Sequence, residues 1–231
     1  MKILSFIPAR GGSKGIKNKN LIPFNGKPLI FSTITTSKKL KNVTSFVSTD
    51  SKKILNYSKL NGIKYNYLRP KKLATDQSEV INSIFHALSW FKEKNVFFDA
   101  VMMLQPTTPV RKLSEIKKII NIFKKRKIDS IISVTKMKEH PYECIKYKGN
   151  SWDFIEKKKI RSKRRQDYPQ NFYFIDGSVY LAKVSFLKKN KTFVLKNKTK
   201  LFISSQFPGI DIDNYVDLKI SELFIKKNKN N

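Results

Sequence analysis

The sequence has few of the residues that stabilise small secreted proteins or bind transition metals. It contains one cysteine, Cys144, and two histidines, His86 and His140, which are far apart in the sequence. A single thiol excludes an internal disulfide, and one cysteine with two histidines supplies no cluster of ligands for zinc or an iron–sulfur centre. A disulfide-stabilised fold and a protein built around either metal centre are therefore excluded.

Long apolar runs are also missing. The first apolar segment, Ile3–Ile7, is interrupted at once by Pro8 and Arg10, and no later stretch approaches the ~20 apolar residues that span a membrane. The first segment is also too short for a signal peptide. We therefore expect a cytoplasmic protein that has no membrane partner.

Acidic residues are scarce. The 231 residues include 17 Asp and Glu against 48 Lys and Arg, which gives a formal charge of +31. Such a charge ordinarily indicates nucleic acid or another polyanion as a partner. Here the lysines are spread over the whole chain in short runs, without the dense stripe and interleaved aromatic residues of a nucleic-acid surface. The pattern favours solvated faces, and a non-catalytic anion- or RNA-binding protein is the alternative.

Short apolar runs alternate with amphipathic segments of helical length. The hydrophobic fraction of 40% is enough for one sizeable core, and we expect residues 1–231 to form a single domain. The runs predict strands at Ile3–Ile7, Thr44–Ser48, Ile63–Leu68, Ala100–Leu104 and Ser130–Val134. Strands separated by helices predict an α/β fold with a Rossmann-like, doubly wound, mostly parallel sheet. Ligands of such sheets bind beyond the carboxyl ends of the strands.

The pattern becomes irregular between about residues 137 and 195. Hairpin-like segments at Tyr142–Ile160 and a strand at Ser178–Ala182 predict an insertion that covers the site or meets a partner subunit. A strand at Leu201–Ser205 and a helix at Tyr215–Ile225 follow. Helical spacing predicts that the inner face of this helix carries Val216, Ile220, Leu223 and Phe224.

A basic, glycine-rich loop follows the first strand. Its glycines let the backbone approach a ligand, and its cations and hydroxyl group suit an anion. The groups concerned are the backbone of Gly11 and Gly12 and the side chains of Arg10, Ser13, Lys14 and Lys19. The spacing matches neither the Walker A loop nor Gly-x-Gly-x-x-Gly. The loop therefore predicts a polyphosphate site of another kind, with a merely solvated turn as the alternative.

Asp211 and Asp213 form an Asp-x-Asp pair near the end of the chain. Alternate side chains of an extended segment point the same way, so both carboxylates can bind one hard cation, for which Mg²⁺ is the natural choice. The alternative is that Asp213 caps the following helix, but this explains only one of the two residues.

Several motifs occur in an order that resembles one family. They are Arg10-Gly-Gly-Ser-Lys-Gly15, Arg69-Pro-x-x-Leu-Ala-Thr-Asp76, Leu104-Gln-Pro-Thr-Thr-Pro-x-Arg111, Arg165-Gln166, Gly177 with Tyr180, and Ile210-Asp-Ile-Asp213. Together they span nearly the whole chain and resemble the acylneuraminate, or nonulosonic acid, cytidylyltransferases. The resemblance implies a nucleotidyltransferase that moves CMP from CTP to the anomeric hydroxyl of a nonulosonic acid and releases pyrophosphate.

The resemblance also implies roles for matching residues. Nucleotide contacts would come from Arg10, Gly11, Gly12, Ser13, Lys14, Lys19, Asn20, Arg69 and Ser78. Sugar contacts would come from Gln105, Thr107, Arg111, Arg165 and Gln166. The catalytic residues would be Arg10, Lys14, Lys19 and Asp211, and the magnesium ligands would be Asp211 and Asp213. In this family the irregular segment dimerises and completes the partner's site, so a homodimer is expected.

The identity of the sugar stays open. Neuraminate enzymes carry an arginine followed by Pro-Asn-Gly where this chain has Phe172–Gly177. Sialic, legionaminic and pseudaminic acids are all consistent with the motifs. The 3-deoxy-manno-octulosonate cytidylyltransferases, which lack the Gly-Ser-Lys-Gly loop, are the alternative enzyme class. The acceptor of the hydroxyl proton is also open between a hydroxide on the metal and a carboxylate such as Asp211.

Overall fold

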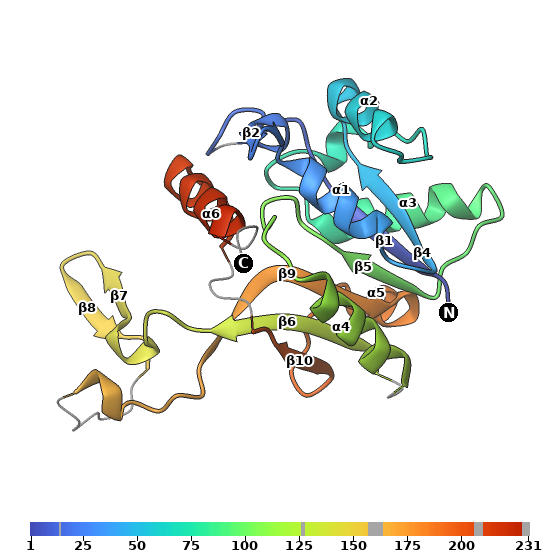
Figure 1. Cartoon of the computed structure of the whole chain (residues 1–231). Coiled ribbons are helices and arrows are strands. Elements are labelled where there is room, and N and C mark those ends of the chain that lie inside the picture. Colours follow the sequence, from blue (N-terminus) through green and yellow to red (C-terminus); the bar gives the residue numbers. More distant parts are fainter. Residues whose placement is uncertain (14, 126–127, 157–163, 206–209, 228–231) are drawn as a thin grey trace.

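A computed structural model describes residues 1–13, 15–125, 128–156, 164–205 and 210–227 (Figure 1). Its centre is a six-stranded sheet. In spatial order the strands are β10 (Thr199–Ile203), β6 (Ser130–Lys136), β9 (Tyr173–Lys183), β5 (Ala100–Met103), β1 (Ile3–Pro8) and β4 (Val43–Ser48). Only β9 runs antiparallel to its neighbours among these strands. The predicted mostly parallel α/β sheet is confirmed.

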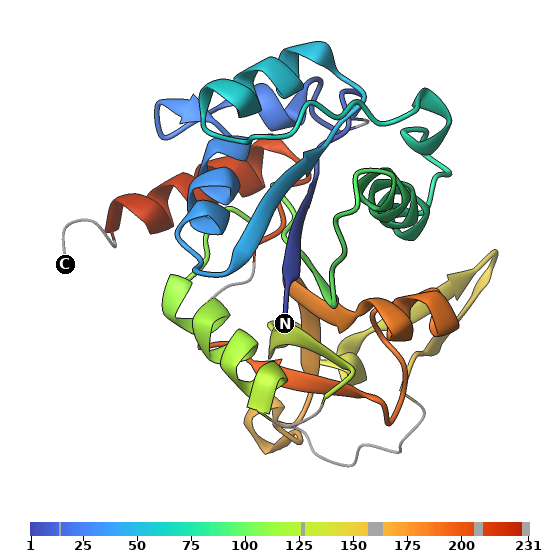
Figure 2. The ribbon, with the colours of Figure 1, turned by 90° about the vertical axis from the view of Figure 1, so that its right-hand side faces the viewer.

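Helices cover both faces of the sheet, as Figures 1 and 2 show. They are α1 (Ile30–Lys38), α2 (Lys52–Leu60), α3 (Val80–Lys92), α4 (Leu113–Lys125), α5 (Val184–Asn190) and α6 (Tyr215–Lys227). Leu4 and Phe6 of β1 share a core with α3 and α5, whereas Ile3 and Ile7 pack towards α4 and α1. Because β1 is buried on both faces, it appears in the sequence as an unbroken apolar run.

Shorter elements connect these layers. The single-turn helices are η1 (Lys19–Leu21), η2 (Lys71–Leu73), η3 (Pro141–Glu143) and η4 (Arg165–Asp167). Two small hairpins pair β2 (Pro23–Phe24) with β3 (Lys27–Pro28), and β7 (Ile145–Lys148) with β8 (Ser151–Phe154). No helix in the described ranges is both long enough and apolar enough to cross a membrane.

The predicted strand at Ile63–Leu68 does not form. β4 is the end strand of the sheet, and the segment after α2 runs beyond it without joining the ladder. Ile63 and Tyr67 are buried, and a bond from Arg69 N to Thr49 O (2.7 Å) ties down the end of the segment. The segment thus contributes Ile63 and Tyr67 to the core without forming a strand, because side-chain burial alone does not make a strand.

The irregular stretch is shorter than predicted. β9 lies between β5 and β6 in the middle of the sheet, and α5 follows it directly. The part that leaves the sheet comprises the described residues 137–156 and 164–172, and we call it the arm. It carries β7 and β8 and projects from one end of the sheet in Figure 1. Residues 157–160 of the predicted hairpin region lie outside the described residues.

The predicted inner face of α6 is wrong for three of its four residues, and only Phe224 is partly buried. Val216 and Leu223 are each 66% exposed and Ile220 is 40% exposed, whereas Leu218 is 5% exposed. Leu218 joins a buried cluster with Ile212. The helix has two apolar stripes, and the buried Ile212 immediately before it determines which stripe faces inward.

Candidate active site

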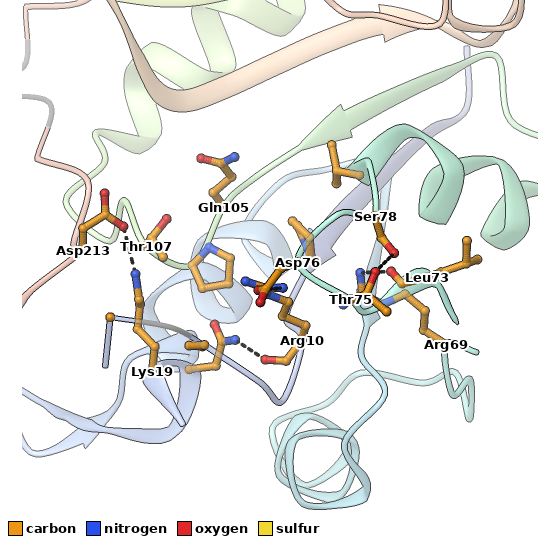
Figure 3. A pocket seen from close by; sticks show the side chains of 16 residues that line it. Arg10, Lys19, Arg69, Leu73, Thr75, Asp76, Ser78, Gln105, Thr107 and Asp213 are labelled. Atoms are coloured by element: carbon orange, nitrogen blue, oxygen red, sulfur yellow. Dashed lines mark hydrogen bonds and ion pairs between the residues drawn. The ribbon is translucent and has the colours of Figure 1, made fainter. Parts of the chain in front are cut away.

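A cavity of about 420 Å³ opens at the carboxyl ends of β1 and β5 (Figure 3). Its wall combines the loop after β1, the segment around η2, the loop after β5 and the segment after β10. These segments are far apart in the sequence but meet at one edge of the sheet. This is the edge where parallel α/β sheets bind their ligands.

The basic loop contributes Arg10, Ser13, Gly15 and Lys19 to the wall. Asn20 also lines the cavity, and its Nδ2 donates a hydrogen bond to Arg10 O at 3.0 Å. Asn20 is 7% exposed, so it braces the loop from within. Lys14 lies outside the described residues, and its role stays a prediction.

The predicted glycines of this loop differ in their surroundings. Gly11 N donates to Asp50 Oδ1 at 2.8 Å, and a Cβ on Gly11 would lie 3.0 Å from Ser51 Cβ. The close approach to the residue that precedes α2 therefore favours glycine at this position. Gly12 has no neighbour within 4 Å of an added Cβ, so its absent side chain leaves room on the open side of the loop.

Lys19 joins the basic loop to the Asp-x-Asp segment. Its Nζ donates to Ile212 O at 2.7 Å and pairs with Asp213 Oδ1 at 3.0 Å. On the other side, Ile212 N donates to Thr107 O at 2.8 Å. A methyl group on Gly15 would collide with Asp213 O. Three of the four segments of the wall are thus in direct contact.

The two aspartates lie on one side of an extended segment. Ile212 between them is fully buried, whereas Asp211 and Asp213 are exposed. This alternation places both carboxylates outward, as the sequence predicted. In the described part of the chain, no group of three or more His, Cys, Asp or Glu residues is placed to hold a metal ion. Two carboxylates supplemented by substrate phosphates are nevertheless a usual magnesium site, so the donor set fits that ion.

Arg69 and Ser78 line the opposite wall. Arg69 is 5% exposed and donates to Ser48 O (3.1 Å) and Ser83 Oγ (3.2 Å), and burial lowers the pKa of its guanidinium. Its Nε has no hydrogen-bond partner within the described structure. Ser78 Oγ donates to Lys72 O at 2.8 Å. Both predicted residues reach the cavity, and Arg69 also holds the wall together.

The predicted sugar residues fall into two groups. Gln105 and Thr107 line the cavity. Arg111 instead donates to the backbone of Gln105 and to Ser178 O (2.8 Å), and lines a separate cavity beside α1. Burial lowers the pKa of Arg111 to about 9, so it remains charged at neutral pH. The structure therefore makes Arg111 a brace behind Gln105.

The remaining two sugar candidates lie on the arm. Gln166 is exposed in η4, away from the cavity of its own chain. The side chain of Arg165 is outside the described structure. Within one chain, the structure therefore does not bring Gln166 to the cavity, and the role of Arg165 stays a prediction.

Sequence reasoning gave no role to two acidic residues. Asp76 lines the cavity and its Oδ1 pairs with Arg10 Nη1 at 2.6 Å. Asp176 is 2% exposed, accepts hydrogen bonds from Ser133 Oγ (2.5 Å) and Ser178 N (2.8 Å), and burial raises its pKa. Two features of the sequence could have indicated them. Asp76 ends the motif that begins at Arg69, and Asp176 directly precedes Gly177.

A mostly parallel sheet with a basic glycine-rich loop at its carboxyl edge defines a nucleotide-binding α/β protein. The chain belongs to the cytidylyltransferase family, whose family model matches residues 4–228. It is therefore a nucleotidyltransferase, and the resemblance found in the motifs is confirmed.

Relatives with named activities align along nearly the whole chain. A CMP-N,N'-diacetyllegionaminic acid synthase of Legionella pneumophila is 34% identical over 99% of this chain and 98% of that protein. An N-acylneuraminate cytidylyltransferase of Streptococcus agalactiae is 29% identical over 94% of this chain and 52% of that protein. A solved CMP:2-keto-3-deoxy-manno-octonic acid synthetase with CTP superposes with a TM-score of 0.71 at 13% identity, covering 99% of this chain and 100% of that one. At that identity the likeness concerns the fold alone.

Proposed function

We propose that this chain transfers CMP from CTP to the anomeric hydroxyl of a nonulosonic acid of the legionaminic type and releases pyrophosphate. The observation that carries the proposal is the cavity in which Lys19 of the basic loop meets Asp213, in a member of the cytidylyltransferase family. The choice of sugar follows the Legionella relative, which matches over nearly the full length of both chains. The reaction would take place in the cytoplasm, where CTP is available.

The chemistry requires positioning and charge compensation. The sugar hydroxyl attacks the α-phosphorus in line with the departing pyrophosphate, so the protein has mainly to hold the reactants and offset negative charge. In this proposal Arg10, Ser13 and Lys19 bind the triphosphate, while Gln105 and Thr107 orient the sugar. Their side chains line one cavity, which supports a common role.

Asp211 and Asp213 would hold Mg²⁺. When bound there, the ion would neutralise charge on the phosphates. Lys19 already contacts Asp213, so this lysine would lie between the aspartate pair and the triphosphate. The same lysine would then offset charge on the phosphates and keep the Asp-x-Asp segment in place.

We further propose that the arm pairs with a second copy of the chain. In the β7–β8 hairpin, Ile145 lies opposite Phe154 and Tyr147 opposite Trp152, so these apolar side chains share one face. Each of the four is 45–70% exposed. The other face carries the pair Lys146 and Asp153. One apolar face and one polar face are typical of a hairpin covered on one side by a partner.

Pairing of arms would also account for Gln166. This residue is exposed on the arm of its own chain, and the family resemblance implies that the arm completes the partner's site. The proposed dimer would therefore bring the predicted sugar contacts of one chain to the cavity of the other.

The test is pyrophosphate release from CTP and Mg²⁺ with one acceptor at a time. The acceptors are N,N'-diacetyllegionaminate, pseudaminate, N-acetylneuraminate and 3-deoxy-manno-octulosonate, with CTP alone as the control. We expect the legionaminate to give the highest kcat/KM. Preferred use of the octulosonate, or no release with any acceptor from folded protein, would overturn the proposal.

A further inference from the structure

Asp76 faces the basic loop from the opposite wall of the cavity. It lies between η2 and α3, and its Oδ1 is 2.6 Å from Arg10 Nη1 (Figure 3). The two side chains are 44% and 33% exposed, and both line the cavity. This ion pair therefore spans the space between the proposed phosphate side and the wall that carries Arg69 and Ser78.

The segment that carries Asp76 is itself held in place. Thr75 Oγ1 and Ser78 Oγ are 2.7 Å apart, and Ser78 Oγ donates to Lys72 O at 2.8 Å. Arg69 and Ser83 both donate to Leu73 O. The carboxylate of Asp76 is thus presented from a braced turn, which makes it a suitable fixed point for a flexible side chain.

Arg10 has a fixed backbone but a long, flexible side chain. Its carbonyl accepts the bond from Asn20, whereas the described ion pair of its side chain is the one to Asp76 through Nη1. A guanidinium carries five N–H donors in a planar fork. Arg10 can therefore keep Asp76 on one nitrogen and offer other donors to a phosphate at the same time.

We propose that Asp76 is a positioning residue that aims the guanidinium of Arg10 at the triphosphate of the bound nucleotide. The inference rests on the proposed function, in which Arg10 contacts the phosphates. Asp76 touches neither phosphate nor sugar in this proposal and acts through Arg10. It also ties the wall that carries Arg69 and Ser78 to the phosphate side, so the distance between the two sides of the nucleotide site is fixed before CTP binds.

The test compares kcat and KM for CTP in Asp76→Ala, Asp76→Asn and Asp76→Glu, measured as pyrophosphate release at saturating acceptor. Misplacing a contact by about 1 Å can cost on the order of 10²-fold, so we expect Asp76→Ala to lower kcat/KM about 10- to 100-fold. The larger part of the loss should be in kcat, because a misplaced arginine still contributes charge to binding. Asp76→Asn, which keeps the shape, should lose less, and Asp76→Glu should recover part of the activity.

Glu79→Ala is the matched control. Glu79 is an exposed carboxylate at the end of the same segment, just before α3, so its removal changes the net charge equally. We expect less than about a twofold change for this variant, since exposed charges away from a contact have small effects. Equal losses in Glu79→Ala and Asp76→Ala would overturn the inference, because the effect would then be one of net charge.

A double variant tests whether Asp76 acts through Arg10. In an Arg10→Ala background, Asp76→Ala should cost less than about a further twofold, since coupled residues are not additive. A full additional loss would overturn the inference, as would tighter CTP binding in Asp76→Ala, which would mean that Asp76 competes with phosphate. Unchanged turnover in the Asp76 variants would overturn the inference about Asp76 but not the proposed function. A wild-type protein without turnover would overturn the proposed function.

Discussion

The central sheet and the arm are both built from strands, but their strands have opposite environments. In β1 five of the six residues are buried, whereas all eight residues of β7 and β8 are exposed. The arm nevertheless carries large apolar side chains such as Tyr147 and Trp152. An isolated two-stranded hairpin is at best marginally stable in water. The sheet is therefore stabilised by its own helices, while the arm has apolar surface that one chain leaves uncovered.

The largest expected effect is on the stability of the sheet. Phe46 is fully buried, with its ring centroid 4.9 Å from those of Tyr67 and Phe91. Phe46→Ala should lower the free energy of unfolding by about 3–5 kcal/mol, because it leaves a cavity in a packed core. Urea unfolding measures this.

The matched variant for that experiment is Phe154→Ala in the arm, where the side chain is 45% exposed. At protein concentrations low enough to keep the chain monomeric, it should cost less than about 1 kcal/mol, because little apolar area is buried there. Equal losses of unfolding free energy in Phe46→Ala and Phe154→Ala would contradict the view that the sheet is stable within one chain while the arm needs a partner.

The next effect concerns catalysis at the edge of the sheet. Asp211→Ala should lower kcat by about 10²–10³-fold, in line with the loss of one electrostatic contact in an active site, while CTP still binds. Pyrophosphate release measures kcat, and calorimetric titration with CTP measures binding. The exposed Asp153 of β8 supplies the control, Asp153→Ala, which should retain turnover. Full turnover in Asp211→Ala would remove this residue from the mechanism.

A smaller effect is expected on the dissociation constant of the proposed dimer. Trp152→Asp places a charge on the apolar face of the hairpin and should weaken pairing by about 2 kcal/mol, the cost typical of a central aromatic contact. Light scattering across a dilution series measures the dissociation constant. Lys146→Asp lies on the opposite face of the hairpin and should leave it unchanged. Equal shifts in both variants would indicate that the apolar face is not the contact.

The smallest effect is a pH dependence inside the sheet. Burial raises the pKa of Asp176 above 3.8, so the folded state holds the proton more tightly than the unfolded state. The stability that this provides is fully present at low pH and is lost as the pH rises through the raised pKa. Asp176→Asn is neutral throughout and lacks this loss. Its free energy of unfolding, relative to wild type, should therefore rise from pH about 4 towards neutrality. If the difference in free energy of unfolding between Asp176→Asn and wild type stayed constant across this pH range, the raised pKa of Asp176 would be contradicted.

The sequence predicts the buried strands well and the outer elements less well. A strand buried on both faces, such as β1, is an unbroken apolar run, so its position follows from composition alone. Whether Ile63–Leu68 joins the sheet depends on a neighbouring ladder, which a single segment does not specify. The inner face of α6 depends on what Ile212 packs against, and two apolar stripes made the choice ambiguous.

The candidate site shows the same division. The convergence of the loops that carry Lys19 and Thr107 follows from the rule that parallel strands end at one edge, whereas this rule does not place Asp213. The orientation of a cation does not follow from its motif, and Arg111 turns to backbone carbonyls instead of the cavity. Asp76 has a contact that becomes visible only when two distant loops are placed together.

The bonds from Lys19 to Ile212 and Asp213 link residues 193 and 194 positions apart. On the ribosome the amino-terminal loop is made first, but its lysine has to wait for nearly the whole chain before it meets these partners. Contacts of such long range also slow folding, because a large loop has to close before they form. The nucleotide pocket is therefore completed late in synthesis, and a nascent or truncated chain that ends before Ile212 carries the basic loop without an assembled site.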